Sequence, residues 1–284
     1  MRKLLSAEFS RLLHSLVFRL CLLFSAGLAV FSTTMRWLDI RENAELYAKL
    51  SVDYRNADGL VFIGGLYLIF AIAVFLGIFV GTEYSDGTIR NKLMVGHTRR
   101  DIWFSKLIIC AVAAVVINIL YILAALAFGG VMLGGTTMEL SQILLCSLAV
   151  TMAVLALTAF LLLFSMLIQS KAVGSVACLL MTILMLFAAI TIYQKLSAPE
   201  YYDAYQYTMD NGKTISVEKE KNPHYLTGTK RKVYEFLDTT LPVSQLFTVG
   251  RNELDGLEDF GIMMVSDLVI ILAATGAGIL VFQK

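Results

Sequence analysis

Charged residues are scarce in this chain of 284 residues: Asp, Glu, Lys and Arg make up 16% of it, and hydrophobic residues make up 58%. Soluble domains typically contain about 25% charged and about 45–50% apolar residues. The shortage of charge argues against a soluble globular enzyme, and the abundance of apolar residues argues against a disordered chain. Because the apolar residues are clustered in long runs, the composition predicts a membrane protein with several spans.

Motifs that carry catalysis are also missing. The sequence contains no HExxH, no GxSxG and no GxxxxGK[ST] phosphate loop, so it lacks the signatures of zinc proteases, serine hydrolases and phosphate-loop ATPases. Four cysteines, Cys21, Cys110, Cys146 and Cys178, lie in apolar runs without a CxxC pair, which predicts buried thiols rather than disulfides or a metal site. We therefore expect no enzyme activity, no cofactor and no metal site in the chain itself.

Proline is rare, and all three prolines fall between residues 194 and 259. Proline therefore interrupts none of the apolar runs, six of which are long enough for a helix to cross the hydrocarbon core. The predicted spans are residues 16–35, 60–81, 107–128, 143–168, 172–193 and 260–282. Because backbone groups in lipid must be satisfied internally, we expect an all-α polytopic membrane protein with a single domain over residues 1–284.

The distribution of basic residues predicts the orientation of these spans. The segment 82–106 carries five Lys and Arg residues, whereas the segment 129–142 carries none. Lys and Arg in short loops are retained on the cytoplasmic side of a membrane. We therefore expect segment 82–106 and both termini to be cytoplasmic. The net charge of only +1 gives no basic field for nucleic acid.

Residues 1–15 have the pattern of an amphipathic helix lying on the inner membrane surface. The apolar stripe consists of Leu5, Phe9, Leu12 and Leu16, and the charged residues Arg2, Lys3, Glu8 and Arg11 lie mostly away from it. The alternative is a plain cytoplasmic extension of the first span.

The outer loop 194–259 is too long for a simple connection, so we expect it to have its own structure. Asp210-Asn211-Gly212 between two strand-like runs predicts a β-hairpin. Val233, Phe236 and Leu237 indicate a short helix beyond it. A last apolar group is expected to rest on the outer leaflet, and its members are Leu246, Phe247 and Val249.

Polar residues within the spans are few. Asn118 in the third span is expected to bond to a neighbouring helix rather than to a substrate. Asp267 lies about two turns into the last span, where it either reaches the outer interface, the favoured interpretation, or lines a polar cavity. If a cargo path has polar residues, these two are the candidates.

Two pairs of glycines match the small-residue pattern of helix packing. Gly77 and Gly81 lie near the inner end of the second span and predict a close approach of another helix. Gly130 and Gly134 lie at the end of the third span, where a loop is the simpler explanation.

Segment 82–107 is too elaborate for a simple turn. Gly87 and Gly96 bracket a predicted short helix over residues 88–95. This helix has an apolar face and an exposed basic flank, formed by Ile89 and Leu93 on the face and by Arg90 and Lys92 on the flank. Such a helix suits docking into a groove on a partner protein.

A second helix is predicted to begin directly after this short one. Thr98-Arg99-Arg100-Asp101 is a capping-box sequence. Trp103 follows and is expected at the depth of the membrane interface.

These residues together resemble the first cytoplasmic loop of type-2 ABC exporter permeases. The resemblance lies in Glu83, Gly87-Thr88, the short helix, Gly96, Arg99 or Arg100, and Lys106. Members of that family have six spans, cytoplasmic termini, an N-terminal surface helix and a helical or re-entrant segment between the last two spans. The chain is similar in particular to bacterial permeases of peptide-antibiotic export and immunity systems, which lack a fused ATPase.

The resemblance implies that residues 88–95 are the coupling helix of a permease in a bacterial plasma membrane. A separate ATP-binding-cassette ATPase would bind ATP and Mg²⁺, and a second permease, identical or different, and membrane lipid would complete the assembly. The implied coupling residues are Glu83, Gly87, Thr88, Ile89, Arg90, Lys92, Leu93, Gly96, Arg99 and Arg100. The implied cargo is a peptide antibiotic, a lipid or an amphipathic drug.

A different class of function also fits the sequence. A non-transporting sensor or immunity protein would bind an extracellular peptide through the loop 194–259. The two hypotheses differ in whether an ATPase partner is required.

Overall fold

The computed structural model describes residues 1–284 except 51–56, 204, 209–213, 218, 252–256 and 283–284. In this described part, six helices are long and apolar enough to cross a membrane. They are α2 (Leu16–Glu42), α4 (Asp58–Ser85), α6 (Arg99–Met132), α7 (Leu140–Leu167), α8 (Lys171–Leu196) and α11 (Leu257–Phe282). Each coincides with one predicted span, which confirms the all-α polytopic fold.

Helix α4 lies at the centre of the bundle and packs against α2, α6, α7, α8 and the short α10 (Pro242–Gly250). In the most apolar stretch of α4, 61% of the residues are buried inside the protein, compared with 22% in α8 and 17% in α11. The outer helices expose large apolar side chains such as Leu184 and Leu272, which is typical of helices that face lipid or another apolar chain.

The predicted close approach at Gly77 and Gly81 is present, between α4 and α8. A Cβ atom on Gly77 would lie 2.4 Å from the Cα atom of Ser175, and one on Gly81 would lie 2.6 Å from the Cα atom of Lys171. Neither position has room for a larger residue. Gly134, by contrast, has a positive φ of 86° directly after α6, as expected for a loop, whereas the expectation of a loop is wrong for Gly130, which lies inside α6.

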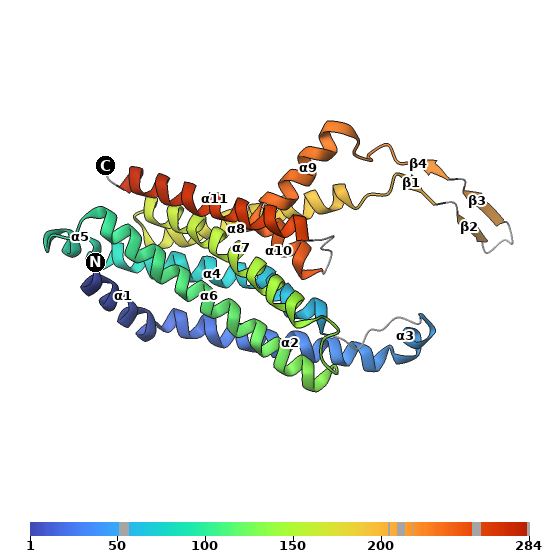
Figure 1. Ribbon diagram of the computed structural model, residues 1–284, viewed down its shortest axis with the longest axis horizontal. Helices are drawn as coiled ribbons and strands as arrows, with labels where there is room; N and C mark the ends of the chain where they lie inside the picture. Colours follow the sequence, from blue (N-terminus) through green and yellow to red (C-terminus); the bar gives the residue numbers. More distant parts are fainter. Residues whose placement is uncertain (51–56, 204, 209–213, 218, 252–256, 283–284) are drawn as a thin grey trace.

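The short elements divide between the two ends of the bundle (Figure 1). The α5 end carries α1 (Arg2–His14), α5 (Thr88–Met94) and the last turn of α11. The opposite end, which we call the ribbon end, carries α3 (Ala44–Leu50) and the four β-strands. The first and last helices therefore end on the same side, as an even number of spans requires.

The strands form a narrow antiparallel ribbon that extends away from the helices (Figure 1). β1 (Tyr201–Tyr202) pairs with β4 (Glu220–Lys221), and β2 (Tyr205–Thr208) pairs with β3 (Thr214–Val217). This pairing confirms the predicted hairpin, while its turn at Asp210-Asn211-Gly212 lies outside the described residues.

The segment after the ribbon returns to the bundle as two helices. α9 (Gly228–Thr240) confirms the predicted short helix, and α10 follows it. The expectation that Leu246, Phe247 and Val249 rest on the outer leaflet is wrong for Leu246 and Val249, because both are buried against the bundle, while Phe247 is half-buried. Gly65 of α4 makes the space: a Cβ atom there would lie 3.0 Å from a methyl carbon of Leu246.

Candidate functional site

A sharply bent elbow joins α4 to α6 at the α5 end. Gly87 and Gly96 flank α5 with positive φ angles of 68° and 95°, a conformation that favours glycine. Thr98 then caps α6, because its hydroxyl oxygen accepts a hydrogen bond of 3.1 Å from the amide of Asp101. The predicted pair of turns around a short helix is confirmed.

Five charged side chains meet behind this elbow, and we call them the charge cluster: Glu8, Arg11, Glu83, Lys92 and Lys106. The Nζ atom of Lys106 lies 2.5 Å from a carboxylate oxygen of both Glu8 and Glu83. Lys92 pairs with the same two acids, at 2.7 Å from Glu83. Arg11 completes the cluster at 2.8 Å from Glu83 and 3.3 Å from Glu8.

The cluster is largely removed from water. Glu8 is 2% and Glu83 1% exposed, and Lys106 is completely buried. Burial alone would raise the pKa of Glu8, but Lys106, Lys92 and Arg11 outweigh it and lower that pKa to about 2. Buried carboxylates are tolerable only with such partners, so the three cations are a condition for the two acids to lie there.

Four elements contribute to the charge cluster. α1 supplies Glu8 and Arg11, the last turns of α4 supply Glu83, α5 supplies Lys92 and the second turn of α6 supplies Lys106. The cluster therefore attaches the short helix α5 to the first helix and to two of the long helices.

Three members of the cluster differ from their predicted positions. Lys92 was expected to be exposed beside Arg90, and Glu8 and Arg11 were expected on the solvated side of α1; instead Lys92 and Glu8 are turned inward. A signal for Glu8 was present, because it lies four residues from both Leu4 and Leu12, which are also buried.

The outward face of α5 also differs from the prediction. Ile89 is only 6% exposed and Leu93 is half-buried, so the apolar face predicted for docking packs against the protein itself. Beyond them Met94 is 71% and Val95 80% exposed. We call the exposed residues Arg90, Asn91, Met94 and Val95 the α5 ridge.

A family model described as "ABC-2 family transporter protein" matches residues 39–209, more than half of the chain. The chain belongs to the ABC-2 transporter family. The matched segment includes α5 and Glu83, Lys92 and Lys106, whereas Glu8 and Arg11 precede it. No curated protein and no solved structure matches the chain.

Family membership makes this protein a multi-pass membrane permease of a transport system, and it implies partnership with an ATP-binding-cassette ATPase subunit. It also favours the transport hypothesis over a non-transporting sensor. In the part of the permease that the structure describes, no three His, Cys, Asp or Glu residues are grouped as metal ligands.

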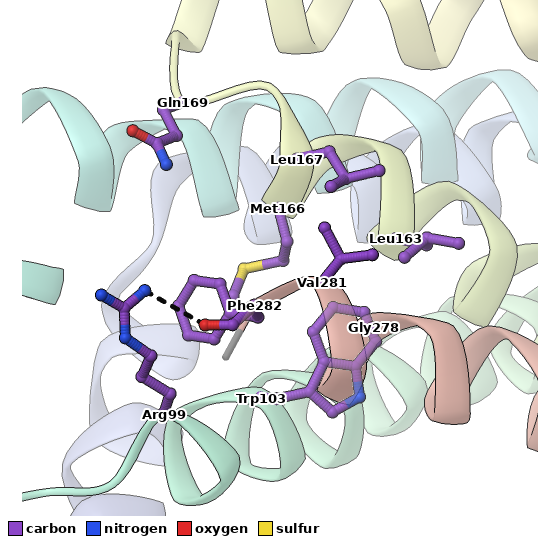
Figure 2. A pocket seen from close by; sticks show the side chains of 9 residues that line it. All are labelled: Arg99, Trp103, Leu163, Met166, Leu167, Gln169, Gly278, Val281 and Phe282. Carbon is purple, nitrogen blue, oxygen red and sulfur yellow. Dashed lines mark hydrogen bonds between the residues drawn. The ribbon is translucent and has the colours of Figure 1, made fainter. Parts of the chain in front are cut away.

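The remaining elbow residues of the permease have structural contacts. Thr88 donates its hydroxyl to the carbonyl of Glu83 at 3.2 Å. Arg99 donates to the carbonyl of Phe282 at 3.1 Å and so ties the start of α6 to the last turn of α11 (Figure 2). Arg100 is exposed.

Arg99 also borders a cavity of about 320 Å³ between α6, α7 and α11, shown in Figure 2. Trp103 lines this cavity and is completely buried between helices; its expected depth at the membrane interface stays a prediction. It occupies the space opposite Gly278, where a Cβ atom would lie 2.0 Å from the indole ring. Trp103 therefore joins α6 to α11.

The two polar candidates within the spans are both buried. Asn118 donates its amide to the hydroxyl of Thr151 on α7 at 3.2 Å, which confirms the predicted bond between neighbouring helices. Asp267 is 1% exposed and lies beside Gln245 of α10, so it does not reach the outer interface as expected. Their role in a cargo path stays a prediction.

Proposed function

We propose that this permease is the membrane-spanning subunit of an ATP-driven exporter and that α5 receives the mechanical force of a separate ATPase. The charge cluster carries this proposal, because it fixes a short helix of seven residues to α1, α4 and α6 at once. A displacement of α5 is therefore transmitted to long helices rather than absorbed in a loop.

The α5 ridge supplies the surface for the partner. Met94 and Val95 are prominent apolar side chains at the end of α5, and Arg90 and Asn91 are polar neighbours. An apolar centre with a polar border is the usual composition of a docking surface. The ridge, rather than Ile89 and Leu93, is the part of α5 that fits a groove on an ATPase.

In this assignment the α5 end lies in the cytoplasm of a bacterial cell. Segment 82–106 carries five basic residues there, which suits the cytoplasmic side of a membrane. ATP and Mg²⁺ would bind to the partner ATPase. Two such permeases, identical or different, would enclose the path, and their weakly charged spans suit a peptide antibiotic, a lipid or an amphipathic drug as cargo.

Co-purification with the cognate ATPase tests the docking surface. Met94→Asp and Val95→Asp should each reduce the amount of ATPase that co-purifies by about tenfold or more, because a charge is placed in an apolar contact. Val131→Asp is the matched control, since Val131 is 86% exposed on the last turn of α6, at the opposite end of the bundle. Undiminished ATPase binding by both ridge variants would contradict the proposal.

A further inference from the structure

Asp267 on α11 differs from the other buried acids of the permease that the structure describes. It is 1% exposed, and neither oxygen of its carboxyl group has a hydrogen-bond partner among the described residues. Asp58, at the same end of the bundle, is also buried, but it accepts hydrogen bonds from both the amide and the hydroxyl of Thr137. Glu8 and Glu83 have the cations of the charge cluster.

The side chain of Gln245 on α10 is 2% exposed and is a polar neighbour of Asp267. Its amide nitrogen is already engaged, with the carbonyl of Thr239 at 2.9 Å and the hydroxyl of Ser266 at 3.0 Å. Its oxygen, Oε1, is buried and has no partner. Ser266 in turn donates to the carbonyl of Met263 at 2.7 Å. The donors beside Asp267 are therefore in use, whereas three acceptor atoms are unsatisfied.

No cation balances Asp267 in the described residues, where no Lys, Arg or His nitrogen lies within 4.0 Å of it. The elements packed around α11 carry few titratable groups at this end. α10 has none, α7 has only Cys146, and Tyr121 of α6 donates its hydroxyl to the carbonyl of Leu60. Asp238 of α9 accepts hydrogen bonds from Ser244 and Thr248.

The charged groups of α9 other than Asp238 are directed elsewhere. Arg231 pairs with Glu235 at 2.9 Å on the surface, and Lys230 and Lys232 are exposed. The charged residues of α6 lie in its first turns, at the α5 end. An ionised Asp267 would therefore be a buried charge without a cation, which is among the least favourable arrangements in a protein.

A proton on the carboxyl group of Asp267 would remove this buried charge. A protonated carboxyl group is a hydrogen-bond donor as well as an acceptor. We propose that Asp267 is a proton-binding site, at which the buried carboxyl group beside Gln245 of α10 holds a proton at neutral pH. The ligand is a proton, and the site lies apart from the coupling elbow and does not depend on the ATPase.

Release of the proton has a structural consequence. The carboxylate would then be a buried charge beside Gln245 without a cation to balance it, which is unfavourable. The contact between α10 and α11 would weaken, while the apolar contacts of Leu246 and Val249 with the bundle would remain.

Infrared spectroscopy of the full-length permease in lipid tests the proton directly. At neutral pH the wild type should show the carbonyl stretching band of a protonated carboxylic acid, and Asp267→Asn, which keeps shape and neutrality, should remove it. Asp58→Asn is the matched control and should leave the band in place. A wild-type spectrum without any band that depends on Asp267 would overturn the proposal.

Two further measurements cover the case in which Asp267→Asn does not fold. In Gln245→Leu the polar neighbour of Asp267 is lost, so the band should persist but shift in frequency, because the carbonyl stretch depends on hydrogen bonding to the carboxyl group. In the wild type the band should disappear as the pH is raised, together with a fall in the melting temperature relative to neutral pH. A band unaffected by Gln245→Leu would contradict the assigned partner.

Discussion

Single residues at the α5 end show how a long-range partner can override local amphipathicity. Glu8 has the sequence context of a solvated residue on a surface helix, yet it lies in the charge cluster with Lys92 and Lys106. Its neighbours Leu4 and Leu12 are buried on the same face. The face of α1 that contacts the bundle therefore includes Glu8. It does not include the whole predicted apolar stripe, since Phe9 of that stripe is 43% exposed.

The pKa of Glu8 predicts how the stability of the permease depends on pH. In the folded protein this pKa is lowered from 4.5 to about 2, so folding favours the ionised form. The resulting stabilisation, on the order of 3 kcal/mol, is complete above pH 4.5 and is lost as the pH falls from 4.5 to about 2. Glu8→Gln lacks this contribution at every pH.

The measurement is the unfolding free energy of wild type and Glu8→Gln across this pH range. Their difference should be constant at neutral pH and should shrink below pH 4.5. Glu42→Gln, which changes an exposed acid at the end of α2, serves as the control and should follow the wild type. A difference that stays constant down to about pH 2 would show that Glu8 is not held ionised by its partners.

At the scale of elements, the contact between α4 and α8 depends on glycine. Gly77→Leu should lower the unfolding free energy by about 1–3 kcal/mol, because even a Cβ atom would lie 2.4 Å from the Cα atom of Ser175. Gly27→Leu on α2 is the matched control, since a Cβ atom there meets nothing within 4 Å. Equal stability of the two variants would contradict the packing described here.

Local sequence signals were sufficient for most elements. Long apolar runs predicted the six spans, and Gly87, Gly96 and Thr98 predicted the elbow, because a helix boundary depends on residues within one turn of it. The position of α10 was not predictable in this way. Leu246 and Val249 are apolar in either environment, and only the space at Gly65 of α4, distant in sequence, decides that they lie inside the bundle.

The candidate site was predictable only in part, for the same reason. The elbow residues were identified from their own spacing. The ion pair between Lys92 and Glu8 joins residues 84 positions apart, and no periodicity in a single sequence encodes such a distance. Charges of both signs near several helix ends allow many pairings, and the packing of α1 against α6 selects one of them.

At the scale of the whole molecule, docking and transmission should be separable. Lys92→Met removes the cation that ties α5 to Glu8 and Glu83 but leaves the α5 ridge intact. We expect this variant to bind the ATPase normally and to lower transport by on the order of fivefold. The measurements are co-purification and transport in vesicles with the matched ATPase.

Lys3→Met, which neutralises an exposed lysine of α1, is the control and should transport as the wild type does. Loss of ATPase binding in Lys92→Met would assign Lys92 to the docking surface instead. Normal binding together with normal transport would show that the charge cluster plays no part in transmission.

The cluster also constrains the order of events during biosynthesis. Glu8 is translated about a hundred residues before Lys106. At a ribosomal rate of about 5–20 residues per second, Lys106 is synthesised roughly 5–20 seconds after Glu8, with which it later pairs. A chain arrested before residue 106 would therefore hold Glu8, and later Glu83, without the buried cation that pairs with both.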